Sequence, residues 1–245
     1  MLLLSKRYRQ RYNGEDVISE RVLENGHWNT TTERIPNNVI NNQISNRAAV
    51  FSNGLGQLAL DPRHIINKKS GLLGAASLQT YGCNAFYRDY NPDFLIATDL
   101  PIVQEMFDKG YHRKNIVYTR VDINLRYPRS FYLIPYDPYA DAGTTALYLA
   151  CFDGHKTIYM LGFDGQDTPG FNNNIYAGTN GYDAKDYTIS SASWRQNQVT
   201  VFNTYTDVDF VFVTETGRAS IPESWKYCLN LRQISCRDMV LEADL

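Results

Sequence analysis

Short apolar segments alternate with longer mixed segments along most of the chain, and this pattern begins at Arg47. Strands that are short and apolar on both faces are typical of a parallel sheet with helices on its two sides. We therefore predict an α/β fold with a doubly wound, mainly parallel, Rossmann-like sheet. The expected strands are 48–51, 77–82, 94–98, 115–118, 131–134, 156–161 and 208–213.

Helices are expected between these strands. Pro101 in a first turn and Gly110 after a last turn bracket one helix, and Gly154 ends another that starts at Ala142. Further helical segments are predicted at 84–89, 193–205, 222–227 and from 236 onward. Residues 165–188 are rich in Gly, Asn and Gln, which predicts a long loop of the kind that often carries function.

The first 46 residues are polar and are predicted to form an arm with a β-hairpin. Segments 17–23 and 28–35 have strand character, and the Asn25-Gly26 pair between them tolerates the positive φ of a tight turn. An isolated hairpin is marginal in water, so it must lie on the main domain or on another subunit. We accordingly divide the chain into an arm, 1–46, which is a candidate contact in a homo-oligomer, and a Rossmann-like domain, 47–245.

Charge and composition narrow the classes of partner. Lys and Arg number 24 and Asp and Glu 26, so a net charge of -2 gives no broad attraction to nucleic acid or to anionic lipid. The basic and aromatic residues at 6–12 are interpreted as a solvated arm in preference to a single-strand binding site. No apolar run reaches about 18 residues, which predicts no membrane span and a cytoplasmic location.

The four cysteines, Cys83, Cys151, Cys228 and Cys236, form no CxxC pair and have no histidine at metal-ligand spacing. In a chain long enough to bury a full core, such cysteines are expected to be buried thiols.

The candidate site follows from where parallel sheets bind ligands, which is beyond the carboxyl ends of their strands. Small, polar and acidic residues follow several predicted strands and open the helix at Ala142. They are Asn53, Gly54 and Gly56, Asn84, Asp99, Gly143, Thr144 and Thr145, Gly162, Asp164 and Asp167. We predict that they converge on one ligand site, with a phosphate at this edge.

Each part of this site also has a structural interpretation, and both stay open. The Asn53-Gly54-Leu55-Gly56 loop offers N–H groups to an anion, or is only a tight turn. Gly143, Thr144 and Thr145 offer a second anion site, unless Asp141 or Thr144 simply caps the helix. Asp164 and Asp167 suit Mg²⁺, or one of them suits a catalytic base, but Asp-Gly pairs are also common in turns.

Several of these segments resemble a known group of proteins. The Asn53-Gly54-Leu55-Gly56 loop, Asn84 after the second strand, and the Pro92-Asp93 strand that ends in Asp99 resemble a Rossmann-like superfamily. It includes MptE-like 6-hydroxymethylpterin diphosphokinases and motility-associated glycosyltransferase-like proteins. Segments 141–146 and 158–164 resemble its second half and the small motif of sialyltransferases. The resemblance covers about residues 46–167 and implies a transferase that moves a glycosyl or diphosphoryl group from a nucleotide-linked donor.

The chain departs from these patterns at two points. Sialyltransferases of this kind carry a catalytic histidine after the small motif, whereas no histidine follows His155 here. Gly56-Gln57 stands where the diphosphokinase pattern has Pro-Ser. The whole chain also resembles uncharacterised proteins of marine bacterial viruses, so the alternative function is a non-catalytic viral structural or assembly protein that keeps the scaffold. The expected location is then the host cytoplasm.

Overall fold

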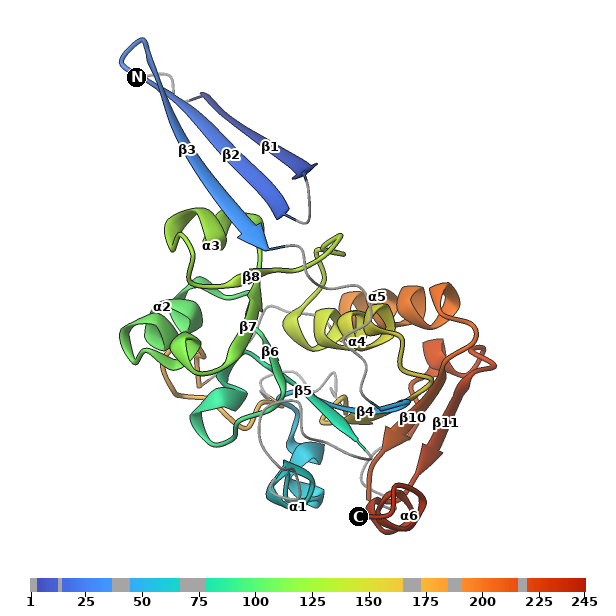
Figure 1. The fold of residues 1–245 in the computed structure, drawn as a ribbon. Helices are drawn as coiled ribbons and strands as arrows, with labels where there is room; N and C mark the ends of the chain where they lie inside the picture. The colour runs from blue at the N-terminus through green and yellow to red at the C-terminus, as the bar shows by residue number, and fades with distance from the viewer. Residues whose placement is uncertain are drawn as a thin grey trace.

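A computed structural model describes residues 4–12, 15–36, 45–66, 78–164, 173–184, 191–215 and 220–245 (Figure 1). Its main feature is an eight-stranded sheet with the order β11-β10-β9-β4-β5-β6-β7-β8, in which every neighbouring pair is parallel. The strands are β4 (Arg47–Phe51), β5 (Gln79–Cys83), β6 (Phe94–Ile96), β7 (Ile116–Thr119), β8 (Tyr132–Leu133), β9 (Thr157–Leu161), β10 (Asp209–Val213) and β11 (Leu231–Ile234).

Helices cover both faces of this sheet, and β4 shows why. Ala48 and Val50 pack into one apolar cluster, whereas Ala49 and Phe51 pack into the other, so that the strand is buried on both sides. The first cluster lies under α4 (Ala142–Asp153) and α5 (Ser191–Thr204), and the second under α2 (Leu100–Asp108) and α6 (Cys236–Glu242). The predicted α/β, doubly wound parallel sheet is confirmed.

The helix at 142–153 is confirmed at both ends. The Asp141 side chain accepts a hydrogen bond from the first turn, and Gly154 stops the helix in a left-handed conformation with φ 102°. The remaining short segments are α1 (Arg63–Ile66), α3 (Val121–Arg126) and the 3₁₀ turns Leu55–Ala59, Asn84–Arg88, Tyr111–Arg113 and Glu223–Trp225. The sequence analysis missed α1 and α3. The start of α3 has no side-chain cap, so the usual sequence signal for a helix start is lacking there.

The N-terminal hairpin is confirmed as β2 (Glu15–Glu24) and β3 (His27–Pro36), with Asn25 and Gly26 at positive φ in the turn. Leu4–Tyr12 forms a third strand, β1, antiparallel to β2, which the sequence analysis did not predict; whether 6–12 is a solvated arm stays a prediction. The register of β1 and β2 runs from Leu4 opposite Leu23 to Tyr12 opposite Glu15. Strand pairing of this kind depends on a partner strand, so the segment alone does not predict it.

The three-stranded sheet lies on the main domain at its lower end and projects away from it at the other (Figure 1). Ile18 of β2 is fully buried against Leu125 and Leu133, and the Glu33 carboxylate accepts a hydrogen bond from the backbone N–H of Arg129. The hairpin therefore has the support that it needs within one chain. A contact with another subunit through residues 1–46 stays a prediction.

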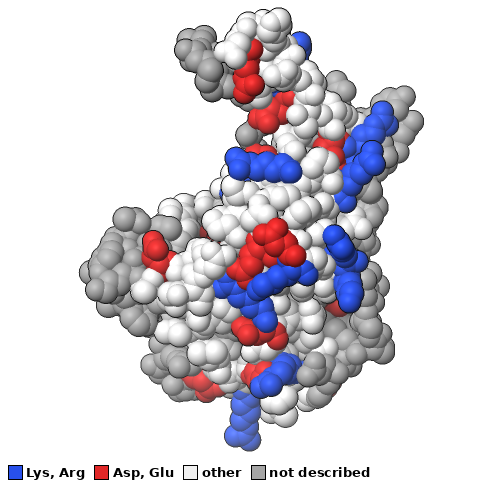
Figure 2. Space-filling model, turned by 90° about the vertical axis from the view of Figure 1, so that its left-hand side faces the viewer, with Lys and Arg blue, Asp and Glu red and all other residues white. Residues whose placement is uncertain are grey.

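Two further features of the described residues bear on the sequence analysis. All four cysteines are buried and free of disulfides, as predicted. Among the described helices, none combines the length and the apolar character that a bilayer crossing requires. Figure 2 shows basic and acidic side chains interspersed on the face that carries the projecting sheet.

The strand order identifies where a ligand would bind. From β4 the chain runs outward through β5, β6, β7 and β8, and it then returns to the other side of β4 with β9, β10 and β11. The order reverses between β4 and β9, and the crevice beyond the carboxyl ends at such a reversal is where open α/β sheets bind ligands.

Candidate functional site

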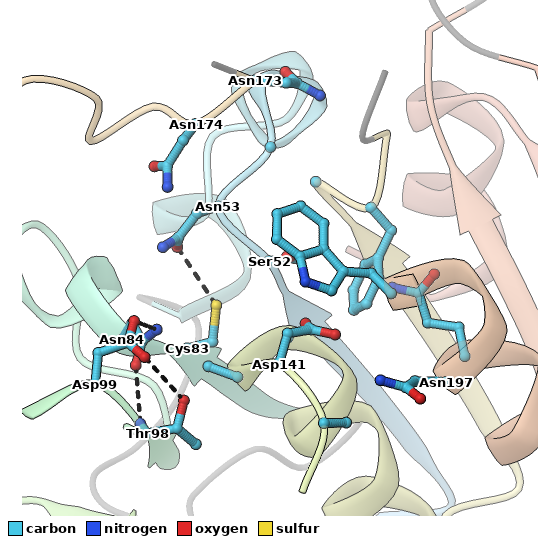
Figure 3. Close-up of a pocket in the computed structure, with 18 of the residues that line it drawn as sticks. Ser52, Asn53, Cys83, Asn84, Thr98, Asp99, Asp141, Asn173, Asn174 and Asn197 are labelled. Atoms are coloured by element: carbon cyan, nitrogen blue, oxygen red, sulfur yellow. Dashed lines mark hydrogen bonds between the residues drawn. The ribbon is translucent and has the colours of Figure 1, made fainter. Parts of the chain in front are cut away.

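A cavity of about 740 Å³ lies at this reversal (Figure 3). Its walls come from the carboxyl ends of β4, β5, β6, β7 and β9, from the start of α4, from the first turns of α5, and from segment 173–184. Of the residues predicted from sequence, six line it: Asn53, Gly54, Asn84, Asp99, Gly143 and Gly162. Gly56, Thr144, Thr145 and Asp164 are close by but do not, and Asp167 lies outside the described residues.

Three of the N–H groups in the loop after β4 are bonded within the protein and are not free for a phosphate. The N–H of Gly54 donates to Gly162 O at 3.0 Å, and that of Leu55 donates to Asn173 Oδ1 at 3.1 Å. The N–H of Gly56 donates to Asp164 Oδ2 at 2.8 Å. Asp164 therefore holds the β4 and β9 loops together, and a catalytic or Mg²⁺-binding role for it stays a prediction.

The glycines of these loops allow the two chains to approach closely. A Cβ on Gly54 would lie 2.4 Å from Gly162 O, and one on Gly162 would lie 2.3 Å from Ser52 O. Gly162 also has φ +73°, which strains any other residue. The structural interpretation of the loop, a tight turn, accounts for these glycines without a ligand.

We expect Gly162→Ala to lower the free energy of unfolding by about 2–5 kcal/mol, from overpacking and backbone strain together. Gly26 is the matched control, because its φ is +81° and a Cβ there would meet nothing within 4 Å. Gly26→Ala should therefore show the strain alone, about 1–2 kcal/mol. Urea denaturation of the two variants measures the difference, and equal losses would mean that the two loops can separate at no cost.

The start of α4 is closed by its own cap. Asp141 Oδ1 accepts from the Thr144 N–H at 2.9 Å, and Oδ2 accepts from Thr144 Oγ1 at 2.6 Å. Thr145 Oγ1 donates to Ala140 O at 3.3 Å. The two threonines are thus engaged as the capping interpretation expects, and the Asp141 carboxylate stands where an anion would have bound. Burial raises the pKa of Asp141, although the hydrogen bonds from Thr144 oppose the shift.

Asn84, Thr98 and Asp99 form a second group on the opposite wall (Figure 3). Asn84 Nδ2 donates to Asp99 Oδ2 at 2.7 Å, and its Oδ1 accepts from the Thr98 N–H at 3.0 Å. Asn84 has φ +43°, a conformation that Asn tolerates better than most residues. Burial raises the pKa of Asp99. The amide is fully oriented by the protein, and the carboxylate has lone pairs left for a ligand hydroxyl.

Asn53 connects β4 to segment 173–184. Its side-chain Nδ2 donates to the Tyr182 hydroxyl at 3.2 Å, and its backbone carbonyl oxygen accepts from the Ile175 N–H at 2.9 Å. The Cys83 thiol donates to Asn53 Oδ1 at 3.5 Å, and burial raises the pKa of Cys83 far enough to keep it neutral. Segment 173–184, part of the loop that the sequence marked as a candidate for function, is thereby fixed as a wall of the cavity.

The sequence analysis named only six of the residues that line the cavity. Arg120 follows β7, so the rule of strand ends would have found it had it been carried one strand further. Ser193, Trp194, Arg195, Asn197 and Gln198 of α5, and Tyr139 before α4, gave no signal, because no strand ends next to them.

The complete lining is rich in amides, carboxylates and aromatic rings. Its charged side chains are the carboxylates of Asp99, Asp141 and Asp183 and the guanidinium groups of Arg120 and Arg195. Within the described part of the chain, no three His, Cys, Asp or Glu side chains are grouped as a metal ion would require. The lining therefore suits a polyhydroxylated ligand with limited negative charge.

Neither a protein-family model nor a curated protein matches the chain. Among solved structures, it is similar to the monofunctional α-2,3-sialyltransferase Cst-I from Campylobacter jejuni, with a TM-score of 0.47 and 11% identity over 80% of this chain and 85% of that one. It is also similar to the sialyltransferase CstII from Campylobacter jejuni in complex with CMP-3FNeuAc, with a TM-score of 0.44 and 12% identity over 68% of this chain and 81% of that one. The resemblances to diphosphokinases and to bacterial viruses stay predictions.

Proposed function

We propose that the chain is a glycosyltransferase that binds a nucleotide-linked sugar in the cavity between β4 and β9. The observation that supports this most is the lining: oriented amides, carboxylates and aromatic rings meet at the strand-order reversal. Sugar hydroxyls both donate and accept hydrogen bonds, and amide and carboxylate groups supply the matching partners.

The charge of the lining favours glycosyl transfer over diphosphoryl transfer. Three carboxylates face two guanidinium groups, so the cavity carries a net negative formal charge. Moving a diphosphoryl group would place still more negative charge there, and enzymes of that kind stabilise it with metal ions and basic side chains. Transfer of a sugar away from a single nucleotide phosphate develops less negative charge in the cavity and needs less stabilisation of it.

Four of the five charged side chains that line the cavity have a role in this proposal. Asp99, oriented by Asn84, accepts hydrogen bonds from ribose or sugar hydroxyls. Arg120 and Arg195 lie beside the leaving phosphate and stabilise its charge. Asp141 accepts the proton of the acceptor hydroxyl as its oxygen bonds to the anomeric carbon and the bond from that carbon to the phosphate oxygen breaks. Its raised pKa makes it a stronger base than an ordinary aspartate.

The first test is a thermal-shift screen against nucleoside mono- and diphosphates and their sugar conjugates, with and without Mg²⁺. A ligand at a hundred times its Kd stabilises the protein by about 2.7 kcal/mol, enough to move the melting temperature by several degrees. A shift with one nucleotide class identifies the donor. A cooperative melt that no nucleotide shifts would refute the proposal and favour the non-catalytic assembly protein.

Arg195→Gln is expected to weaken binding of the identified nucleotide about 10- to 100-fold, since a charge-assisted hydrogen bond to phosphate is lost. Arg113 is the control, because it is exposed and does not line the cavity. Isothermal titration calorimetry should show no change in Kd for Arg113→Gln. Equal Kd values for the Arg195→Gln variant and the wild type would place the phosphate elsewhere in the cavity.

A further inference from the structure

Tyr139 combines three properties that rarely occur together. It lines the cavity, its side chain is exposed, with 77% of the residue accessible, and its backbone is left-handed with φ 54°. A bulky residue in this conformation is an outlier that costs about 1–3 kcal/mol and survives only where neighbours impose it.

The neighbours of Tyr139 do impose it. Its N–H donates to Asp137 Oδ1 at 2.8 Å, and Arg120 Nε donates to Asp137 Oδ2 at 3.1 Å. Arg120 Nη2 also donates to the carbonyl oxygen of Ala140. The guanidinium of Arg120 therefore fixes the backbone on both sides of Tyr139, which lines the cavity as an exposed residue.

The fold does not need a ring at this position. An exposed tyrosine buries little apolar surface, and the ring contact described for it is with the same Arg120, at 5.9 Å from Cζ to the ring centroid. Glycine would adopt the backbone conformation with less strain. The strained backbone thus places an aromatic face where it can contact a ligand in the cavity.

We propose that the Tyr139 ring is the platform on which the acceptor sugar of this transferase stacks, an inference that rests on the proposed glycosyl transfer. The apolar face of a pyranose fits an aromatic ring, and its hydroxyls fit a neighbouring carboxylate. Asp141, the proposed base, lies two residues along the chain and lines the same cavity. Asn84, which orients the proposed donor-binding Asp99, is buried, and Asp99, Arg120 and Arg195 are half-buried, whereas Tyr139 is far more exposed, as the contact of a second substrate would be.

Tyr136 provides a matched control within the same segment. It is also a tyrosine, also left-handed with φ 47°, and also exposed, at 59%. Its ring lies 6.2 Å from that of Phe152 and it does not line the cavity. Any effect of an exposed, strained tyrosine on the fold alone should be the same at the two positions.

The test is saturation-transfer NMR and titration with a panel of methyl pyranosides, each with and without the nucleotide found in the thermal screen. The wild type should bind at least one pyranoside, and Tyr139→Ala should raise its Kd at least tenfold, since stacking on an aromatic ring is worth about 1–3 kcal/mol for nucleobases. Tyr139→Phe and Tyr136→Ala should bind as the wild type does, and the nucleotide Kd should stay within twofold in all variants.

Three outcomes would overturn the inference. They are an unchanged pyranoside Kd in Tyr139→Ala, a wild type that binds the nucleotide but no pyranoside, and a loss of nucleotide affinity in Tyr139→Ala, which would assign the ring to the nucleobase. Failure of the proposed function has a different signature, in which no nucleotide binds at all. The pyranoside titrations without nucleotide then still decide whether Tyr139 binds a sugar.

Melting temperatures separate this role from a structural one. Tyr139→Gly and Tyr136→Gly both remove the positive-φ strain, so both are expected to melt at the wild-type temperature or about 2–4 °C above it. Only Tyr139→Gly should also lose the pyranoside. A melting temperature that falls in Tyr139→Gly would make the tyrosine a structural residue and would contradict the inference.

Discussion

Asp141→Asn is expected to lower the kcat of glycosyl transfer about 100- to 10,000-fold, the range that positioned general bases contribute, with little change in stability. Asparagine caps helices as well as aspartate does, so α4 keeps the acceptor for the Thr144 N–H. The amide cannot take a proton from the acceptor hydroxyl. Release of the free nucleotide from the sugar donor, followed in the presence of acceptor, measures the loss, and the nucleotide Kd should stay within about threefold.

The pH dependence of kcat/KM distinguishes a base from a residue that only shapes the cavity. Transfer needs ionised Asp141, so the rate should fall on the acid side of the pKa that burial has raised. Thr144 Oγ1 hydrogen-bonds to the carboxylate at 2.6 Å and thereby lowers this pKa. Thr144→Val removes that bond and is expected to move the acid limb of the profile to higher pH. An acid limb that does not move, or an Asp141→Asn variant with wild-type kcat, would exclude Asp141 as the base.

The sequence predicted those parts of the molecule that depend on local pattern. Continuous apolar runs such as Ala48-Ala49-Val50-Phe51 have no solvent face and imply a sheet covered on both sides. Pro101 and Gly154 mark helix ends through their own backbone chemistry. Because parallel strands bring their carboxyl ends to one edge, the sequence could also bring Asn53, Asn84 and Asp99 to a single cavity without any contact being known.

What the sequence could not predict depends on partners distant in the chain. Whether the Gly54 and Gly56 N–H groups face a phosphate or the protein depends on Gly162 O and Asp164, more than a hundred residues away. The α5 side chains reach the cavity because the helix packs beside α4, and no motif in Trp194 or Arg195 records that packing. The sequence likewise carries no mark of the left-handed backbone of Tyr139, which the Arg120 contacts impose.

Three buried, hydrogen-bonded side chains at the opposite end of the sheet are expected to give the strongest effect of pH on stability. Tyr81, Asp153 and His155 are fully buried or nearly so, and the Tyr81 hydroxyl lies 2.6 Å from Asp153 Oδ2 and 2.9 Å from His155 Nε2. His155 Nδ1 lies 2.7 Å from the carbonyl oxygen of Ser45. Burial raises the pKa of Asp153 to about 7 and lowers that of His155 to about 4.

The hydrogen bonds among these three side chains explain why the group keeps one ionisable proton when it is buried. The Ser45 carbonyl can only accept, so Nδ1 of His155 donates, and Nε2 of the neutral ring can only accept from the Tyr81 hydroxyl. The Tyr81 hydroxyl donates to Asp153 when the carboxylate is ionised. Below the raised pKa of Asp153 the hydroxyl is free to donate to His155, and the proton of the neutral acid then fills the contact between Asp153 and Tyr81. Asp153 Oδ1 has no partner among the described residues, which suits the carbonyl oxygen of a neutral acid.

Replacing His155 or Asp153 should therefore make stability depend on pH, with opposite slopes in the two variants. In the wild type the two slopes cancel. Between about pH 4 and 6.5 the folded state holds one proton on Asp153 and the unfolded state holds one on His155, so stability does not depend on the pair. In His155→Gln the folded state keeps a proton up to about pH 7 that the unfolded state loses near 3.8, so stability falls as pH rises. In Asp153→Asn the unfolded state gains a proton below 6.5 that the folded state refuses until about 4, so stability falls as pH drops.

Each variant should change by about 3 kcal/mol relative to the wild type between roughly pH 4.5 and 7, in opposite directions. Urea denaturation at several pH values measures both slopes, and the comparison uses only their signs, so a constant loss from the substitution itself does not matter. Asparagine at 153 can donate to Tyr81 as the neutral acid does, so Asp153→Asn should reach wild-type stability near neutral pH. Parallel slopes in the two variants would show that the proton is not held between Asp153 and His155, and an NMR titration of His155 in the wild type would then locate it.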